Sequence, residues 1–173
     1  MITPETTAIT FDVGNTILFP RQSIGEHYAR ASLGHGIPLS VRQAEHRFTT
    51  AWRRAQSASK GLIYGTDHDQ ARAFWLTIIK DVCRTHYGPV TETQHTGILD
   101  DLYELFSRGE TWRVDPAFDT VLQHCRTRGL RVGLVSNWDI RLRRLLEQLG
   151  LVDRVDAVVI SAEVGIEKPD GGI

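Results

Sequence analysis

The sequence predicts an α/β protein with a parallel sheet and a long helical segment inserted after the first strand. Three short apolar, β-branched runs support this class: residues 7–13, 130–137 and 156–161. Helical patterns separate the last two runs, and strands that alternate with helices are typical of a parallel sheet with right-handed crossovers. The helical periodicity between the first run and the others predicts the insertion.

The first run, "TAITFDV", predicts a buried strand that stops at a glycine. Three helices are then expected in the insertion. The Ser40–Gln43 pair has the spacing of a capping box ahead of a helix through about residue 56. The Thr66–Asp67 pair supplies a cap for a second helix, and residues 91–106 carry apolar side chains at helical spacing.

The pattern changes after the insertion. Asp115-Pro116 predicts an N-cap followed by proline at the first position of a helix that ends near Gly129. "LRVGLVSN" (130–137) predicts the second strand, residues 141–149 a short helix closed by glycine, and "DAVVIS" (156–161) the third strand.

Composition narrows the function classes. The chain has 173 residues, a net charge of −1 and two cysteines without CxxC spacing. These values give no reason to expect nucleic acid or a membrane as partner, or a zinc site. Without a leader pattern or a membrane-length apolar run, we expect a soluble, intracellular, cytoplasmic protein. Arg141, Arg143 and Arg144 are expected to form a solvated helix face.

Polar residues follow each predicted strand: Asp12 to Thr16, Ser136 with Asn137, and residues 163–170. In parallel sheets, ligands collect beyond the carboxyl ends of the strands. Each cluster alone is also ordinary turn chemistry. Together they supply a carboxylate nucleophile, a cation at Lys168 and hydroxyl or amide donors for a phosphoryl group.

"TFDVGNT" (10–16), "LVSN" (134–137) and Lys168-Pro169, in that order, resemble the first three motifs of the haloacid dehalogenase superfamily. More narrowly, "TFDVGNT", "CRTRGLRVGLVSNWD" (125–139) and "KPD" (168–170) resemble the haloacid dehalogenase-like hydrolase domain-containing protein 3 group. The resemblance covers essentially the whole chain. It implies a Rossmann-like core at residues 1–19 and 111–173, with a helical cap at residues 20–110.

The resemblance also implies a magnesium-dependent hydrolase of a small phosphorylated molecule. Asp12 would attack phosphorus and form an aspartyl-phosphate. Mg²⁺ would be held by Asp12 and the backbone carbonyl of Gly14, and Lys168 would neutralise charge. The phosphoryl group would be bound by Thr16, Ser136 and Asn137. The cap would close over the substrate and select it.

Gly14 departs from the superfamily pattern. Phosphatases of the superfamily usually have a second aspartate two residues after the nucleophile, which protonates the leaving alcohol. Glycine has no group that moves a proton, so activity on alkyl esters is expected to be weak or lost. Two alternatives therefore stay open: a carbon–halogen hydrolase, for which Arg21 is only a loose match to the usual arginine, and a non-catalytic binding protein.

The sequence ends at Ile173, before the superfamily's fourth motif, an acidic pair that completes the magnesium shell. We expect either a fragment of a longer product or a degenerate protein. The retained Asp12, Ser136 and Lys168 favour the fragment. In the usual strand order the first strand would then be a sheet edge, which favours self-association. Trp52, Tyr64 and Trp75 in the cap are expected to be either site lining or core; the pattern does not separate the two.

Overall fold

The computed structural model describes residues 5–58, 65–84 and 88–173. Its main sheet is parallel, with the order β1 (Ala8–Phe11), β4 (Arg131–Ser136) and β5 (Ala157–Ile160). The predicted α/β class with a parallel sheet is therefore confirmed. The register places Phe11 opposite Leu134 and Ser136 opposite Ile160, so the carboxyl ends of all three strands meet at one edge.

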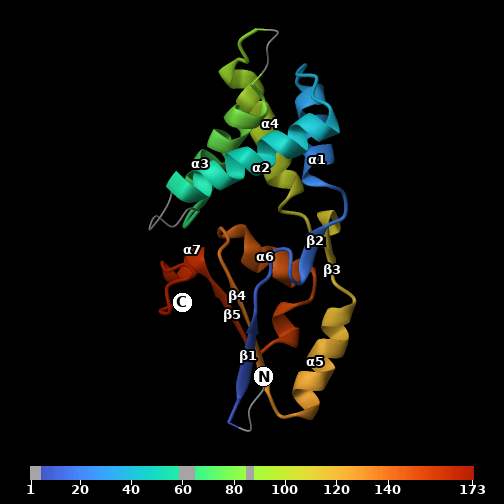
Figure 1. Cartoon of the computed structure of the whole chain (residues 1–173), viewed down its shortest axis with the longest axis vertical. Helices are drawn as coiled ribbons and strands as arrows, with labels where there is room; N and C mark the ends of the chain where they lie inside the picture. The colour runs from blue at the N-terminus through green and yellow to red at the C-terminus, as the bar shows by residue number, and fades with distance from the viewer. Residues whose placement is uncertain (1–4, 59–64, 85–87) are drawn as a thin grey trace.

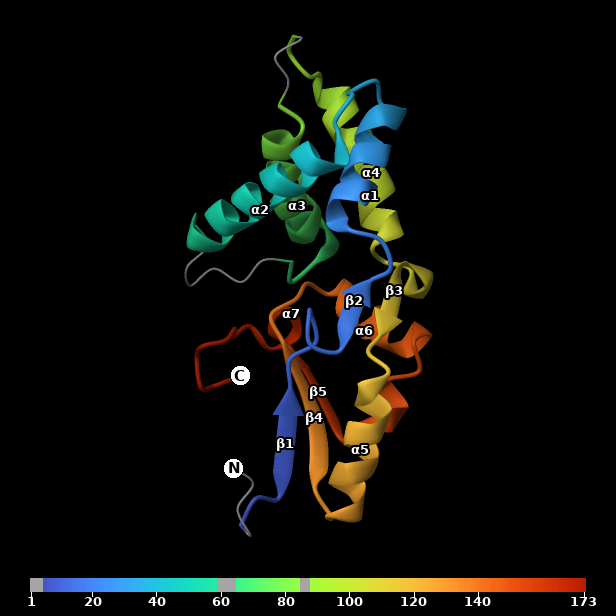
Figure 2. The same cartoon turned by 45° about the vertical axis from the view of Figure 1, so that its right-hand side comes forward.

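Two helices cover the sheet. α5 (Ala117–Thr127) and α6 (Arg141–Gln148) lie on the same side of the strands in Figure 2. They share one hydrophobic cluster with the strands, in which Phe118 of α5 meets Phe11 of β1 edge to face at 5.8 Å between ring centroids. The helix begins one residue later than predicted: the N-cap of α5 is Pro116 and its first residue is Ala117. Asp115 still supports this start, because its Oδ1 accepts from the Ala117 amide at 2.9 Å.

Four helices form a second body above the sheet, with a hydrophobic cluster of their own. They are α1 (Ile24–Gly34), α2 (Val41–Ala58), α3 (His68–Val82) and α4 (Glu92–Leu105) (Figure 1). The predicted start signals of α2 and α3 are present: Ser40 pairs with Gln43, and Asp67 caps α3. α4 begins at a capping box that we did not predict, Thr91 with Gln94. α1, which we did not predict as a separate helix, begins at a further capping box, Ser23 with Glu26.

An antiparallel ribbon joins the two bodies. It consists of β2 (Leu18–Pro20) and β3 (Trp112–Val114), and the predicted domain boundaries at 19/20 and 110/111 fall in or beside it. The remaining elements are short: η1 (Gly109–Thr111), η2 (Val152–Arg154) and α7 (Ser161–Val164). Three-residue strands of this kind carry too little periodicity to be read from sequence.

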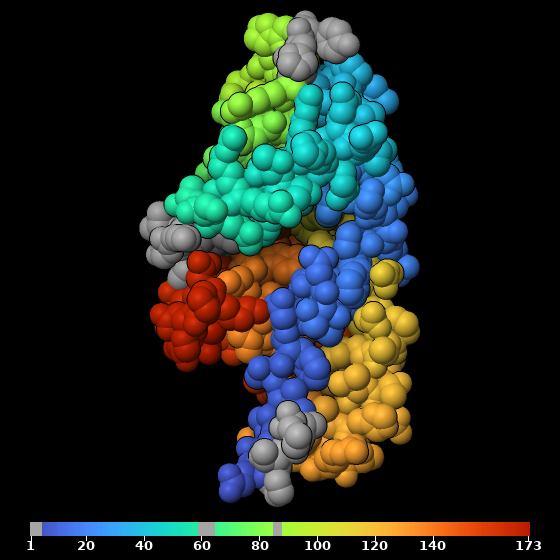
Figure 3. Space-filling view, in the orientation of Figure 1, coloured from blue at the N-terminus to red at the C-terminus, as the bar shows by residue number. Residues whose placement is uncertain are grey.

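The molecule is elongated, with the four-helix cap at one end and the sheet at the other (Figure 1). Figure 3 shows the surface hollowed where the cap meets the core, beside the red C-terminal segment. Within the described ranges, no helix is both long enough and apolar enough to cross a membrane.

Candidate active site

The loop after β1 presents Asp12 at the carboxyl edge of the sheet. The strand was predicted to run to Val13 but ends at Phe11. The reason is a chain reversal: the Val13 carbonyl accepts from the amides of Ile17 at 3.0 Å and Leu18 at 2.9 Å. Asn15 sits at the turn with φ of 57°, a left-handed conformation that asparagine tolerates. Val13 is buried below the loop, while 46% of the Asp12 side chain stays exposed.

Lys168 reaches the same edge from the C-terminal segment. Its Nζ lies 2.6 Å from Asp12 Oδ1 and donates to the Val135 carbonyl at 2.8 Å. The Asn137 side chain fixes the lysine backbone by two hydrogen bonds, accepting from the Lys168 amide at 2.8 Å and donating to its carbonyl at 2.9 Å. Residues distant in sequence are thus assembled into one ion pair, which orients the carboxylate and balances its charge.

The side chains predicted to bind the phosphoryl group differ in their exposure and in their hydrogen bonds. Ser136 ends β4 and is only 2% exposed, and its hydroxyl has no hydrogen-bond partner among the described residues. Thr16 is exposed in the loop after Asp12. Asn137 is engaged with Lys168, so the structure gives it a positioning role. Whether these three side chains bind a phosphoryl group stays a prediction.

The described residues provide only part of a magnesium site. Asp12 offers a carboxylate and Gly14 a backbone carbonyl, but no group of three histidine, cysteine or acidic side chains gathers anywhere in the described ranges. Mg²⁺ prefers six oxygen ligands in octahedral geometry and keeps several waters. Two protein oxygens do not make that shell on their own.

Trp138 is a site residue that the sequence reasoning missed. A Cβ built on Gly14 would lie 3.2 Å from Cζ3 of the Trp138 ring. The ring also packs against Trp112 at 5.3 Å between centroids. The available signal was the placement of a large aromatic residue directly after the strand-end pair Ser136-Asn137.

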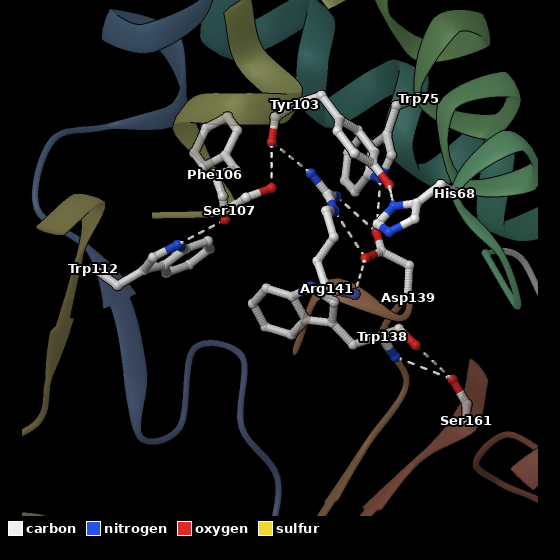
Figure 4. A network of polar contacts seen from close by, with 10 residues as sticks. All are labelled: His68, Trp75, Tyr103, Phe106, Ser107, Trp112, Trp138, Asp139, Arg141 and Ser161. Carbon is white, nitrogen blue, oxygen red and sulfur yellow. Dashed lines mark hydrogen bonds and ion pairs between the residues drawn. The ribbon is translucent and has the colours of Figure 1, made fainter. Parts of the chain in front are cut away.

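A buried ion pair lies just beyond Trp138, where the core meets the cap (Figure 4). Asp139 Oδ2 accepts from Arg141 Nη2 at 2.7 Å and from Trp75 Nε1 of α3 at 2.9 Å. The Arg141 guanidinium lies 4.0 Å from the centroid of the Tyr103 ring in α4 and donates to the Tyr103 carbonyl at 3.2 Å. Burial raises the pKa of the Tyr103 hydroxyl, with the Arg141 charge opposing it.

The expectation of a solvated arginine face is therefore wrong for Arg141, whose side chain is only 7% exposed. Arg143 pairs with Glu163, and Arg144 is exposed as expected. A helix-surface pattern could not reveal the difference, because the partner of Arg141 precedes the helix and the rings around it come from the cap.

An aromatic cavity of about 70 Å³ lies above Trp138. Trp75 lines it together with Tyr28, whose hydroxyl has no hydrogen-bond partner in the described part of the chain. Burial raises the pKa of the Tyr28 hydroxyl. Trp52 stacks on Trp75 at 5.5 Å inside the cap cluster, so of the expected cap residues Trp75 is lining and Trp52 is core. Tyr64 lies outside the described residues.

Comparison with known proteins identifies the family. A family model described as haloacid dehalogenase-like hydrolase matches residues 6–173. The chain belongs to this family. The haloacid dehalogenase-like hydrolase domain-containing protein 3 of Homo sapiens is 37% identical over 164 residues. The match covers 94% of this chain, and the chain spans 64% of the human relative's length. The resemblance inferred from the three motifs is confirmed.

Solved structures with a similar fold are known. A predicted phosphoglycolate phosphatase from Haemophilus somnus superimposes with a TM-score of 0.59 at 15% identity, covering 95% of this chain and 66% of that one. The L-2-haloacid dehalogenase from Xanthobacter autotrophicus with chloropropionic acid covalently bound gives a TM-score of 0.57 at 16% identity, covering 95% and 60%. At these identities the likeness shows the fold alone.

Proposed function

We propose that this member of the haloacid dehalogenase-like hydrolases cleaves a small phosphorylated molecule by transferring its phosphoryl group to Asp12. The observation that carries the proposal is the Asp12–Lys168 pair, with 2.6 Å between Oδ1 and Nζ at the carboxyl edge of the sheet. A half-exposed carboxylate with one oxygen held by a cation leaves the other oxygen for attack on phosphorus.

The surrounding groups fit the charge that develops on a phosphoryl group in transfer. Ser136 at the end of β4 and the exposed Thr16 in the loop after Asp12 carry hydroxyl groups that can donate hydrogen bonds at this edge of the sheet. Lys168 supplies the positive charge that offsets the equatorial oxygens, and its contact with the Val135 carbonyl keeps it at the site. Donors that are already in place cost no reorganisation during the reaction.

Magnesium belongs to this proposal as an ion that Asp12 and the Gly14 carbonyl would hold together with phosphoryl oxygens and water. Bound there, it would screen the repulsion between carboxylate and phosphate. With two oxygens from the described residues, we expect binding to depend on the phosphate.

Carbon–halogen hydrolysis is the second candidate, because halide departs without a proton and Gly14 offers none. The structure places Arg21 in a shallow surface depression with Arg108 and Gln148, beside the β2–β3 ribbon. That position gives no support to a halide- or carboxylate-binding role for Arg21, so the phosphoryl reading is preferred. A non-catalytic binding protein is the third, and it would bind Mg²⁺ weakly in calorimetry even with phosphate present.

The test is release of phosphate and of chloride from a panel of phosphate esters and 2-chloropropionate, with and without Mg²⁺. We expect phosphate release that needs Mg²⁺ and disappears in Asp12→Asn, which keeps the size of the side chain but removes its charge. Chloride release without phosphate release would select dehalogenation. If neither phosphate nor chloride were released, and calorimetry detected no binding of Mg²⁺ in the presence of phosphate, a non-catalytic binding protein would be the remaining candidate.

A further inference from the structure

The space beside Gly14 is filled by an aromatic ring. The backbone at Gly14 has no positive φ, so its conformation does not require glycine. What favours glycine is proximity: a Cβ there would lie 3.2 Å from Trp138 Cζ3, closer than most Cβ contacts, so the ring would have to shift slightly to accept a side chain.

The backbone that carries the ring is anchored. Both the amide and the carbonyl of Trp138 are hydrogen-bonded to the Ser161 hydroxyl, at 3.1 and 3.2 Å. Its ring packs against the buried Trp112, and the two rings line the cavity under the cap. Figure 4 shows this anchoring at Ser161 and the indole lying toward Trp112. Trp138 and Gly14 therefore form a matched pair, in which the large residue occupies the room that the small one leaves.

An acidic side chain elsewhere could also supply a proton to the leaving group. Of the acidic side chains nearest to the site in sequence, two already accept hydrogen bonds and one does not. Asp139 is fully buried and bound by Arg141 and Trp75. Asp170 accepts from the Gly172 amide at 2.8 Å. Glu167, next to Lys168, is partly buried, and its carboxylate makes no hydrogen bond within the described residues.

We infer that the Trp138–Gly14 pair leaves no room for a carboxylic acid at position 14 and so favours phosphoryl compounds whose leaving group departs as a stable anion, such as acyl and aryl phosphates. This inference rests on the proposed transfer to Asp12. An Asp12 oxygen forms a bond to phosphorus while the bond from phosphorus to the leaving oxygen breaks. The electron pair stays on that oxygen, which departs as a carboxylate or phenolate.

The second half of the reaction balances with water alone. Water adds to phosphorus, the bond from phosphorus to Asp12 breaks, and the carboxylate is regenerated. One hydrogen of the water ends on inorganic phosphate and the other is released to solvent as a proton, while the departed anion stays ionised. An alkyl phosphate would instead release an alkoxide, which is a strong base and a poor leaving group. Without a general acid to protonate it, such a step is typically slower by about 10²–10⁴-fold.

The leaving-group series tests the inference. We expect kcat/KM for acetyl phosphate and p-nitrophenyl phosphate to exceed that for ethyl phosphate by at least about 10²-fold. Glu167→Gln should leave this ratio unchanged. Equal rates on ethyl phosphate, or a ratio that grows in Glu167→Gln, would overturn the inference and leave the proposed function standing. Absence of Asp12-dependent release from every compound would overturn the proposed function itself, and the inference with it.

A second measurement tests the pair without relying on activity. Gly14→Ala should lower the urea midpoint of unfolding in the native background and leave it nearly unchanged in the Trp138→Ala background, where the added methyl group has room. An equal loss in both backgrounds would show that the ring does not occupy the space beside Gly14.

Discussion

Removal of the Asp139 carboxylate is expected to destabilise the protein more than removal of any exposed ion pair. Asp139 is fully buried and accepts from the Arg141 amide at 3.1 Å, from Nε at 2.8 Å and from Nη2 at 2.7 Å, as well as from Trp75. In Asp139→Ala the guanidinium stays buried, because it is packed over the Tyr103 ring. Breaking a buried pair from one side costs about 3–5 kcal/mol.

The chain offers a matched control. Arg143 and Glu163 form the same kind of two-point contact, at 2.8 and 2.5 Å, but about a third of each side chain is exposed. Solvent screens such a pair, so Glu163→Ala is expected to cost only about 0.2–1 kcal/mol. The comparison holds the chemistry constant and changes the burial.

Urea unfolding followed by circular dichroism and tryptophan fluorescence gives both free energies. Trp75→Phe adds a third point: it removes one donor to Asp139 and should cost about 1 kcal/mol. If Asp139→Ala cost no more than Glu163→Ala, the pair would be accessible to water in solution and its placement between cap and core would be wrong.

The remaining predictions concern the site, acid stability and the sheet edge. Lys168→Met should slow phosphoryl transfer to Asp12 by at least about 10²-fold in single-turnover assays, with little change in urea midpoint because the pair is half-exposed; unchanged transfer would remove the lysine from the mechanism. His27 is buried, and its two ring nitrogens have no partner in the described residues. Burial, helped by the Arg30 charge, lowers its pKa below 6.5, so the unfolded chain binds the proton more readily. The free energy of unfolding should therefore be highest above that pH and decrease as the pH drops below it. In His27→Leu this decrease should be smaller; an identical pH profile in the variant would show that His27 does not cause it. β1 has a strand partner on one side only within the described residues, so we expect concentration-dependent self-association in light scattering, weakened by a lysine at the exposed Ala8; a monomer at all concentrations would refute it.

The fold was predictable because its strong signals are local. Apolar runs located β1, β4 and β5, side-chain caps located α2 and α3, and apolar side chains at helical spacing located α4. The β2–β3 ribbon was missed, since its pairing joins Leu18 to Val114 across the whole cap and three residues a side carry no periodicity. α7 was missed because it begins at Ser161, the residue that closes the predicted third strand.

For the candidate site, the sequence predicted which residues lie at the ends of the strands but not how their side chains are oriented. Asp12 and Lys168 do meet, as their places beyond the carboxyl ends of two parallel strands led us to expect. The role of Asn137 in holding Lys168, and the ring of Trp138 beside Gly14, depend on side-chain directions in three dimensions. Periodicity and composition carry no information about such directions.

The central claim is that Asp12 is the nucleophile in phosphoryl transfer. It is tested most directly by mass spectrometry of the chain after acid quenching of a reaction with acetyl phosphate and Mg²⁺. We expect one phosphoryl group on the peptide that contains Asp12, absent in Asp12→Asn and retained in Glu167→Gln. Phosphate release without any phosphorylated Asp12 peptide, or release that persists in Asp12→Asn, would contradict the account.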